Sequence, residues 1–204
     1  MRKPAYSDSV FINCPFDNKY GPILRAMIYA VYRCGFYPIT AMIEDNGLDN
    51  RIDKLKRLIE NCRYGIHDIS RIQLNPNKLP RFNMPFELGL FFGASKFGSS
   101  KQKSKNALIL EGTKYLYQQY LSDINGIDTK AHNNDPMQAI RLIRNWLNVV
   151  SRRATLPSDQ LLIAEYRRFL VALPKIARAS GFGVNRIPIN DYCIMAEYFI
   201  QKQI

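Results

Sequence analysis

One charged residue, Glu87, stands inside a largely apolar segment that reads RFNMPFELG from residue 81 to 89. Pro85 favours the first turn of a helix, because its fixed φ suits that position and its missing N–H is not needed there. Asn83 is a natural N-cap two residues earlier. We therefore expect Glu87 in the first turn, where the helix dipole favours its ionised form by about 0.3–1 kcal/mol. A carboxylate at such a place can stabilise a developing positive charge or act as a nucleophile.

The same glutamate also fits a structural role. A glutamate near a helix start can bond back to the preceding loop in a capping box, which satisfies an N–H group and performs no chemistry. Glu87 is the only acidic residue between Asp68 and Glu111. Any acid chemistry of this segment therefore depends on Glu87, and the pattern alone leaves both roles open.

The elements that must position Glu87 alternate between strand and helix over the first half of the chain. Short runs of β-branched and aromatic residues predict four to five strands. They are 9–13, 36–43, 64–69, 106–110 and, as the fifth, 126–130. Apolar residues at helical spacing predict the helices between them. They are 23–34, 52–62, 84–97 and a short one at 115–121. This order predicts an α/β fold with a parallel sheet and helices on both faces, in three layers.

Ligands of such sheets bind beyond the carboxyl ends of the strands, where the strand order switches. Here those ends lead into the loops 14–17, 44–47 and 70–83. The third loop is long for a connection without secondary structure of its own, and it leads directly to Glu87. We therefore expect a site at this edge of the sheet.

From about residue 135 the pattern changes to helices alone. Apolar residues at helical spacing predict three of them, within 137–150, 161–173 and 192–199. We therefore predict an α/β domain over residues 1–133 and a helical extension over 134–204, packed on or beside it.

The net charge of +12, from 29 basic and 17 acidic residues, suits an anionic ligand such as a nucleotide, or a nucleic acid. Solubility alone explains the charge equally well, and no aromatic and basic motif of a nucleic-acid module is present. There is no run of about 18 apolar residues and no apolar signal core, so we expect a cytoplasmic protein without a membrane partner. Four cysteines and two histidines match no metal spacing, which predicts free thiols and no metal site.

Two parts of the sequence resemble known families. The run VFIN at 10–13, followed by Asp17, resembles the first box of TIR domains, where a short hydrophobic strand runs into a polar loop and a helix. The run IHDIS at 66–70, followed by a loop and FELG at 86–89, resembles both TIR domains and nucleoside 2-deoxyribosyltransferases. The resemblance covers residues 9–111. It implies a flavodoxin-like topology, which both families share. It also implies cleavage of an N-glycosidic bond, which is the reaction that both families carry out.

The resemblance implies that this chain is an NAD(P)-type glycohydrolase or a nucleoside or nucleotide glycosyltransferase, with Glu87 as the catalytic carboxylate. Such cleavage passes through an oxocarbenium-like transition state, which a carboxylate can stabilise or attack. Nicotinamide leaves NAD as a neutral molecule and needs no general acid, whereas a purine or pyrimidine usually must be protonated. Asp68 would supply that proton if its pKa were raised, or it caps the next loop. NAD or another nucleotide is then the substrate, and no cofactor is required.

The predicted substrate-binding residues follow from their places on these loops. They are Phe11, Asn13, Phe16, Asp17, Ser70, Arg71, Arg81 and Asn83. Asn13 and Asp17 can bond ribose hydroxyls or a base edge, the two phenylalanines can stack on a base, and the two arginines can pair with phosphates. Core packing is the alternative for Phe11, and a plain surface position is the alternative for the arginines.

Two other functions compete with catalysis. A non-catalytic TIR-like module would sense a nucleotide or bind a partner protein, with the helical last third as an assembly surface. A nucleic-acid-associated basic protein would bind in a strongly salt-dependent way. The family resemblance further implies a homo-oligomer and a role in bacterial antiviral defence.

Overall fold

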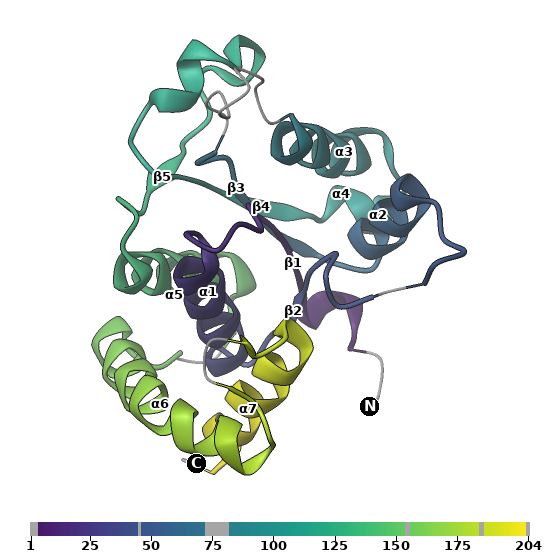
Figure 1. The fold of residues 1–204 in the computed structure, drawn as a ribbon. Helices are drawn as coiled ribbons and strands as arrows, with labels where there is room; N and C mark the ends of the chain where they lie inside the picture. The colour runs from purple at the N-terminus through teal and green to yellow at the C-terminus, as the bar shows by residue number, and fades with distance from the viewer. Residues whose placement is uncertain (1–3, 45, 72–81, 154–155, 184–185, 203–204) are drawn as a thin grey trace. The chain divides into compact units, whose positions relative to one another are not determined.

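The structure is a computed structural model that describes residues 4–44, 46–71, 82–153, 156–183 and 186–202. It contains a five-stranded sheet with the strand order β2-β1-β3-β4-β5 (Figure 1). The strands are β1 Ser9–Asn13, β2 Tyr37–Ile39, β3 Tyr64–Asp68, β4 Asn106–Glu111 and β5 Lys130–Ala131. All four neighbouring pairs are parallel. This is the order of flavodoxin-like sheets, so the predicted fold class is confirmed.

The helices between and after the strands follow the predicted pattern in most places. The α-helices are α1 Gly21–Arg33, α2 Arg51–Glu60, α3 Asn83–Phe97, α4 Ser100–Lys103, α5 Pro136–Ser151, α6 Asp159–Ala179 and α7 Ile189–Gln201. The 3-10 helices are η1 Tyr6–Asp8, η2 Leu116–Gln119 and η3 Ser122–Ile124. The helix predicted at 115–121 is therefore a short 3-10 helix. The strand predicted at 36–43 ends at Ile39, because Thr40 turns the chain by accepting from the backbone N–H groups of Met42 and Ile43.

The chain divides into two compact units. The first comprises Met1–Gly21 and Tyr37–Asp135, and so holds the sheet with α2 and α3. The second comprises Pro22–Phe36 and Pro136–Ile204, so that α1 belongs with the three C-terminal helices. The predicted boundary at 133/134 stays a prediction, since compactness alone does not show which segments fold independently.

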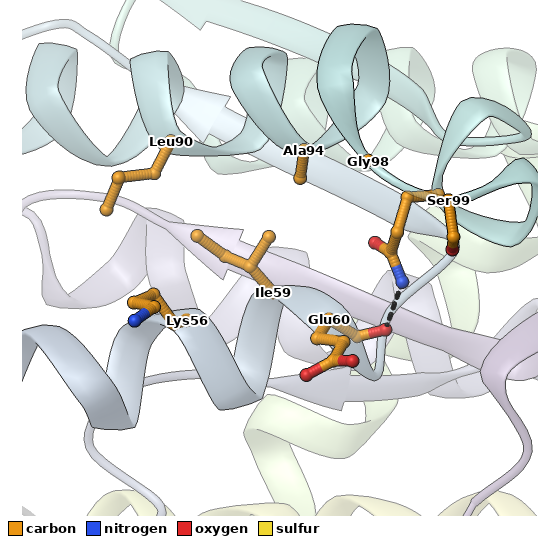
Figure 2. Close-up of a pocket in the computed structure, with 8 residues that line it drawn as sticks. Lys56, Ile59, Glu60, Leu90, Ala94, Gly98 and Ser99 are labelled. Atoms are coloured by element: carbon orange, nitrogen blue, oxygen red, sulfur yellow. Dashed lines mark hydrogen bonds between the residues drawn. The ribbon is translucent and has the colours of Figure 1, made fainter.

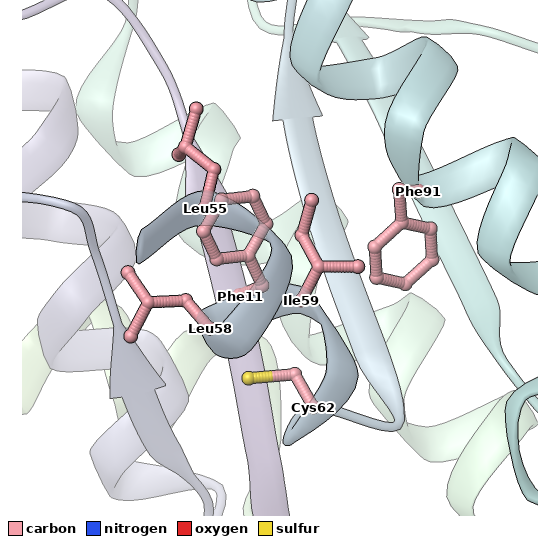
Figure 3. Packing of buried hydrophobic residues seen from close by; sticks show 6 residues of the cluster. All are labelled: Phe11, Leu55, Leu58, Ile59, Cys62 and Phe91. Atoms are coloured by element: carbon pink, nitrogen blue, oxygen red, sulfur yellow. The ribbon is translucent and has the colours of Figure 1, made fainter. Parts of the chain in front are cut away.

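One face of the sheet in the first unit is covered by α2 and α3. Phe11 of β1, Phe91 of α3 and a row of α2 residues form a buried apolar cluster there (Figure 3). The α2 members are Leu55, Leu58 and Ile59, with Cys62 just after the helix. Helical spacing in α2 and alternation in β1 bring these side chains together, as amphipathic patterns do.

His67 packs on the same face as Phe11, in a space that exists because residue 65 is glycine. Gly65 is the partner of Phe11 across the β1–β3 pair, and His67 is the partner of Asn13. A Cβ atom at Gly65 would lie 2.7 Å from Nε2 of His67 and 2.8 Å from the ring of Phe91. Burial lowers the pKa of His67 to about 3, so the ring is neutral and serves as packing.

The second unit has its own aromatic core and a buried ion pair. The ring of Tyr29 in α1 stacks on Phe169 of α6, with centroids 5.3 Å apart, and Phe169 in turn meets Tyr192 of α7 edge-on. Arg33 of α1 donates two hydrogen bonds to the carboxylate of Glu165 in α6, at 2.6 and 3.2 Å. Two parallel bonds of this kind fix the geometry of the pair as well as its charge. They hold α1 and α6 together within this unit.

Lys105, just before β4, closes the end of α2. Its Nζ donates to the backbone carbonyl of Ile59 at 2.6 Å and also to that of Cys62. The ammonium group lies 4.6 Å from the centroid of the Phe91 ring. Burial lowers the pKa of Lys105 to about 8. A cation at this place satisfies carbonyl groups that the end of a helix leaves without intrahelical partners.

We predict that Lys105→Met lowers the free energy of unfolding at pH 7 by about 1–3 kcal/mol, because charge-assisted hydrogen bonds to two carbonyls are lost. Between pH 8 and the ordinary lysine value of 10.5 the unfolded chain binds more protons than the folded one, so wild-type stability should rise with pH there. The variant should lack this rise. Urea unfolding at several pH values measures both effects, with the exposed Lys103→Met as control. A variant with wild-type stability and the same pH slope would contradict this.

Candidate functional site

Asn13, the last residue of β1, ties the sheet to the start of α3. Its Nδ2 donates to the carbonyl of Met84 at 2.9 Å and lies 3.2 Å from Nδ1 of His67. Both amide hydrogens are thereby used, and the carbonyl of Met84 fixes which end of the amide is the nitrogen. Within the described residues, the buried Oδ1 atom of Asn13 meets no hydrogen-bond donor. A buried acceptor of this kind is uncommon and is a feature of a site that a ligand can complete.

The start of α3 differs from the prediction. The helix begins at Asn83 itself, Phe82 takes the N-cap position with a helical backbone, and no side chain caps this end. Asn83 is exposed. The prediction that Asn83 is the N-cap and that Glu87 lies in the first turn was therefore wrong. Glu87 is the fifth residue of α3, while Pro85 stays among the first residues, whose N–H groups are unused.

Glu87 is nearly buried and has an exposed cation as its partner. Its side chain is 2% exposed, and Oε1 lies 3.3 Å from Nη2 of Arg51, the first residue of α2, whose side chain is 65% exposed. Burial raises the pKa of Glu87, and the charge and hydrogen bond of Arg51 oppose that rise. Glu87 thus pairs with a neighbouring helix, and no capping box is seen among the described residues. It is a nearly buried carboxylate beside one exposed guanidinium group.

Asp68, the last residue of β3, is fully buried and accepts hydrogen bonds from three donors among the described residues. The donors are Oη of Tyr20 at 2.6 Å, Nε2 of His132 at 2.8 Å and the backbone N–H of Ser70 at 2.8 Å. Burial and the Asp68 carboxylate raise the pKa of Tyr20 well above its ordinary value, so Tyr20 keeps its proton. Asp68 is the acceptor in each of these three hydrogen bonds.

Ser70, His132 and Asp68 lie together but do not form a nucleophilic triad. Nδ1 of His132 accepts from the backbone N–H of Asn134 at 3.0 Å. The proton of the neutral ring is therefore on Nε2, which points to Asp68 and lies 3.0 Å from Oγ of Ser70. In a triad the serine and the aspartate bond opposite ring nitrogens. Here they share one nitrogen, and that nitrogen is a donor, so His132 cannot take the serine proton.

The loop after β1 holds two further predicted residues. Asp17 accepts from the backbone N–H of Tyr20 at 3.0 Å, and its other oxygen lies 3.7 Å from Nε of Arg71. The ring of Phe16 is partly exposed. Phe11, in contrast, is fully buried in the cluster of Figure 3, which is the core-packing alternative for this residue. The predicted residue Arg81 lies outside the described residues.

Three carboxylates lie close enough to the thiol of Cys14 to affect its pKa. Burial, then Asp68, then Glu87 and then Asp17 raise the pKa of Cys14 well above its ordinary value. The thiol stays protonated and is a poor nucleophile for that reason. The acidic groups predicted for the site thus gather beyond the ends of β1 and β3.

A separate groove of about 340 Å³ lies between α2 and α3 (Figure 2). Its lining residues are Lys56, Ile59, Glu60, Leu90, Ala94, Gly98, Ser99 and Gln102. These residues belong to the middle and C-terminal parts of the two helices, to the link between α3 and α4, and to α4, whereas Arg51 and Glu87 lie near the N-terminal ends. The groove is therefore distinct from the carboxyl-edge cluster, which comprises Asn13, Asp17, Tyr20, Arg51, Asp68, Ser70, Arg71, Glu87 and His132.

Three residues of the cluster were not predicted: Tyr20, Arg51 and His132. Arg51 follows the loop 44–47, so its place at the carboxyl edge of the sheet was available as a signal. His132 had no such signal, because it reaches Asp68 only through the pairing of β5 with β4. In the described part of the chain, no group of three or more His, Cys, Asp or Glu residues has a metal-binding arrangement. None of the helices described is both long enough and apolar enough for a membrane crossing.

Comparison with known proteins finds no family model, no curated protein and no solved structure that matches this chain. The resemblance to TIR domains and nucleoside 2-deoxyribosyltransferases therefore stays a prediction that rests on the short motifs at 10–17, 66–70 and 86–89. The geometry of the cluster stands independently of it.

We predict that Asp68→Asn lowers the free energy of unfolding by about 2–3 kcal/mol. An amide nitrogen in either orientation would face a donor, from Tyr20 and His132 on one side or from the Ser70 N–H on the other. Urea unfolding measures the loss. Asp128→Asn, at an exposed aspartate of the same unit, is the matched control. A change smaller than about 0.5 kcal/mol, as at ordinary surface sites, would contradict the network.

We also predict that Arg51→Gln raises the pKa of Glu87 further, because Arg51 is the group that opposes the effect of burial. Carbon-detected NMR titration of the Glu87 carboxyl measures this value in both proteins. Lys56→Gln, on the same helix and equally exposed, should leave the titration unchanged. An unchanged or lower pKa in Arg51→Gln would show that the ion pair does not exist in solution.

Proposed function

We propose that this chain cleaves the N-glycosidic bond of NAD or a related nucleotide, with Glu87 as the carboxylate at the sugar. The observation that carries the proposal is the environment of Glu87. It is a nearly buried carboxylate near the start of α3 whose partner, Arg51, is mostly exposed. Because Arg51 is mostly exposed, an anionic ligand can pair with it and so come close to Glu87. Ligands of flavodoxin-like sheets bind at this edge.

The reaction balances with water as the only co-reactant. The bond between C1′ of the ribose and N1 of nicotinamide breaks, and its electron pair stays on the ring nitrogen, which becomes neutral. The carboxylate of Glu87 stabilises the resulting positive charge on the sugar or adds to C1′. Water then forms the new bond to C1′ and releases one proton. The products are nicotinamide, ADP-ribose and that proton.

The surroundings of Asp68 favour a substrate of this kind over a neutral nucleoside. A purine or pyrimidine base usually needs a proton as it leaves. Asp68 accepts three hydrogen bonds and offers no proton through them. In this proposal Asp68 positions the loops, and a leaving group that departs without protonation fits the site better. The predicted catalytic role of Asp68 is then a positioning role.

Several groups near Glu87 suit the remainder of a dinucleotide. Arg51 and Arg71 are cations at the same edge of the sheet, and arginine pairs well with phosphate oxygens. Oδ1 of Asn13, which meets no donor in the described part of the chain, can accept from a ribose hydroxyl. The net charge of +12 attracts an anionic substrate. A cytoplasmic location is part of the proposal, and a role in antiviral defence rests on the family resemblance alone.

The test is product analysis after incubation with NAD. Wild-type protein should release nicotinamide, and Glu87→Gln should be slower by about 10²–10³-fold, because an uncharged amide stabilises the sugar cation poorly. Glu60→Gln, an exposed glutamate of α2, should keep the wild-type rate. The rate should rise with pH through the raised pKa of Glu87, and Arg51→Gln should move that rise to higher pH.

Equal rates for the wild type and Glu87→Gln would contradict the proposal. If the wild type binds NAD in a thermal-shift assay but releases no product at high protein concentration, the hypothesis of a non-catalytic nucleotide-sensing module is favoured. Binding to DNA or RNA that weakens steeply with salt, without any NAD effect, would instead favour the nucleic-acid-associated protein.

A further inference from the structure

Helix α3 carries apolar residues on its outer face as well as on its inner one. Met84, Leu88 and Phe91 are buried against the first unit. Phe82, Phe86 and Phe97 are 67%, 55% and 91% exposed. A soluble helix usually has a polar outer face, and a helix that is apolar all round is usually covered on all sides. The outer face of α3 therefore lacks a covering element in the described part of the chain.

The exposed rings lie on one stripe together with two glycines. Phe82, Phe86, Gly89, Gly93 and Phe97 follow the three- and four-residue steps of a single helix face. A Cβ atom built at Gly89 or at Gly93 would have nothing within 4 Å. Glycine is unfavourable inside a helix, so two of them on one open face need a reason. Close approach of another backbone supplies one.

The stripe matches itself when a second copy is turned around. Phe86 precedes Gly89 by three residues, and Phe97 follows Gly93 by four. In an antiparallel pair that crosses at the glycines, Phe86 of one copy meets Phe97 of the partner subunit, and the reverse holds across the two-fold axis. Such self-complementarity is what a symmetric dimer interface requires.

The exposed apolar area also favours a second copy, and the antiparallel arrangement limits the repulsion between like charges. Glu87 is the only charged residue between Phe82 and Ser95, and it is nearly buried. Chains with a net charge of +12 repel each other, and Lys96 is an exposed cation on the same face of α3, but the antiparallel arrangement keeps the two copies of Lys96 at opposite ends of the contact. Phe86 and Phe97, the rings that this arrangement pairs, expose about 300 Å² per chain, taking ~200 Å² for a fully exposed aromatic side chain. Two copies supply about 600 Å² from these rings, and the helical surface around them must supply about as much again to reach the ~1,200 Å² of specific interfaces.

We infer that two copies of this chain associate through antiparallel packing of α3 on α3, centred on Gly89 and Gly93. The inference is independent of the proposed catalytic activity, since it uses only the outer face of the helix. Glu87 lies on the inner side of the same helix, so the dimer would hold the two acidic clusters in a fixed relation to each other.

The first test is the mass in solution, by size-exclusion chromatography with light scattering. Wild-type protein should be a dimer. Gly93→Leu should be a folded monomer, because the added side chain meets open space within the chain and blocks the close approach of another helix. Phe97→Lys should also be monomeric, because it places a like charge on each side of the contact. Val171→Lys, at an exposed apolar residue of α6, should leave the dimer intact, and circular dichroism checks the fold of each variant. A monomeric wild type, or a dimer that survives both α3 changes, would overturn the inference.

The second test is disulfide cross-linking, which reports the direction of the two helices. Cys14, Cys34, Cys62 and Cys193 are all buried, so added thiols on α3 react against a low background. A mixture of Phe86→Cys and Phe97→Cys chains should form a mixed disulfide. Phe97→Cys alone should not, because residues 86 and 97 are about 16 Å apart along the helix and the two copies of residue 97 lie at opposite ends. Self-linking of Phe97→Cys without the mixed product would overturn the antiparallel arrangement.

Discussion

A carboxylate removed from water must be hydrogen-bonded, and Asp68 at the end of β3 meets that demand with donors from three segments. Tyr20 comes from the loop after β1, Ser70 from the turn after β3, and His132 from the residue after β5. The hydrogen bonds to Asp68 hold the three segments together at the carboxyl edge of the sheet. His132 can serve only as a donor there, since the Asn134 N–H holds its other nitrogen. The candidate site depends on this convergence.

Glu87 and Asp68 are both buried carboxylates, yet their hydrogen-bond partners differ. Asp68 is held by three donors of the described residues. Among the described residues, Glu87 pairs with Arg51, whose side chain is largely in solvent. Burial raises the pKa of Glu87, which is typical of carboxylates in reactive sites. Asn13 combines both situations. Its amide nitrogen bonds the carbonyl of Met84 and so connects β1 to α3, while its amide oxygen has no donor among the described residues. Glu87 and the Oδ1 atom of Asn13 are therefore the two groups with which the proposed ligand could form new contacts.

Most of the fold was predictable from local pattern. Short β-branched runs found four strands near their observed positions, and apolar spacing found α2, α3 and the C-terminal helices, because a periodic face must be buried. Prediction failed where no periodicity exists. The 3-10 helices η1 and η3 and the four-residue α4 are too short to show one, and β2 is cut short by the bonds of Thr40. The N-cap of α3 was misplaced because Phe82 takes that position with a helical backbone and no capping side chain, whereas N-caps usually combine an extended backbone with a polar side chain.

The sequence by itself determined the alternation of strand and helix, the carboxyl edge as the place of a site, and Glu87 as the lone carboxylate of an apolar helix. Only the tertiary structure decided what Glu87 and Asp68 meet. Arg51 is 36 residues from Glu87, Tyr20 is 48 residues from Asp68, and His132 is 64 residues from it. Local periodicity shows which face of an element is buried and says nothing about which distant residue arrives there. That is set by strand pairing, and β5, with two paired residues, leaves too little pattern for the sequence to show that His132 would reach Asp68.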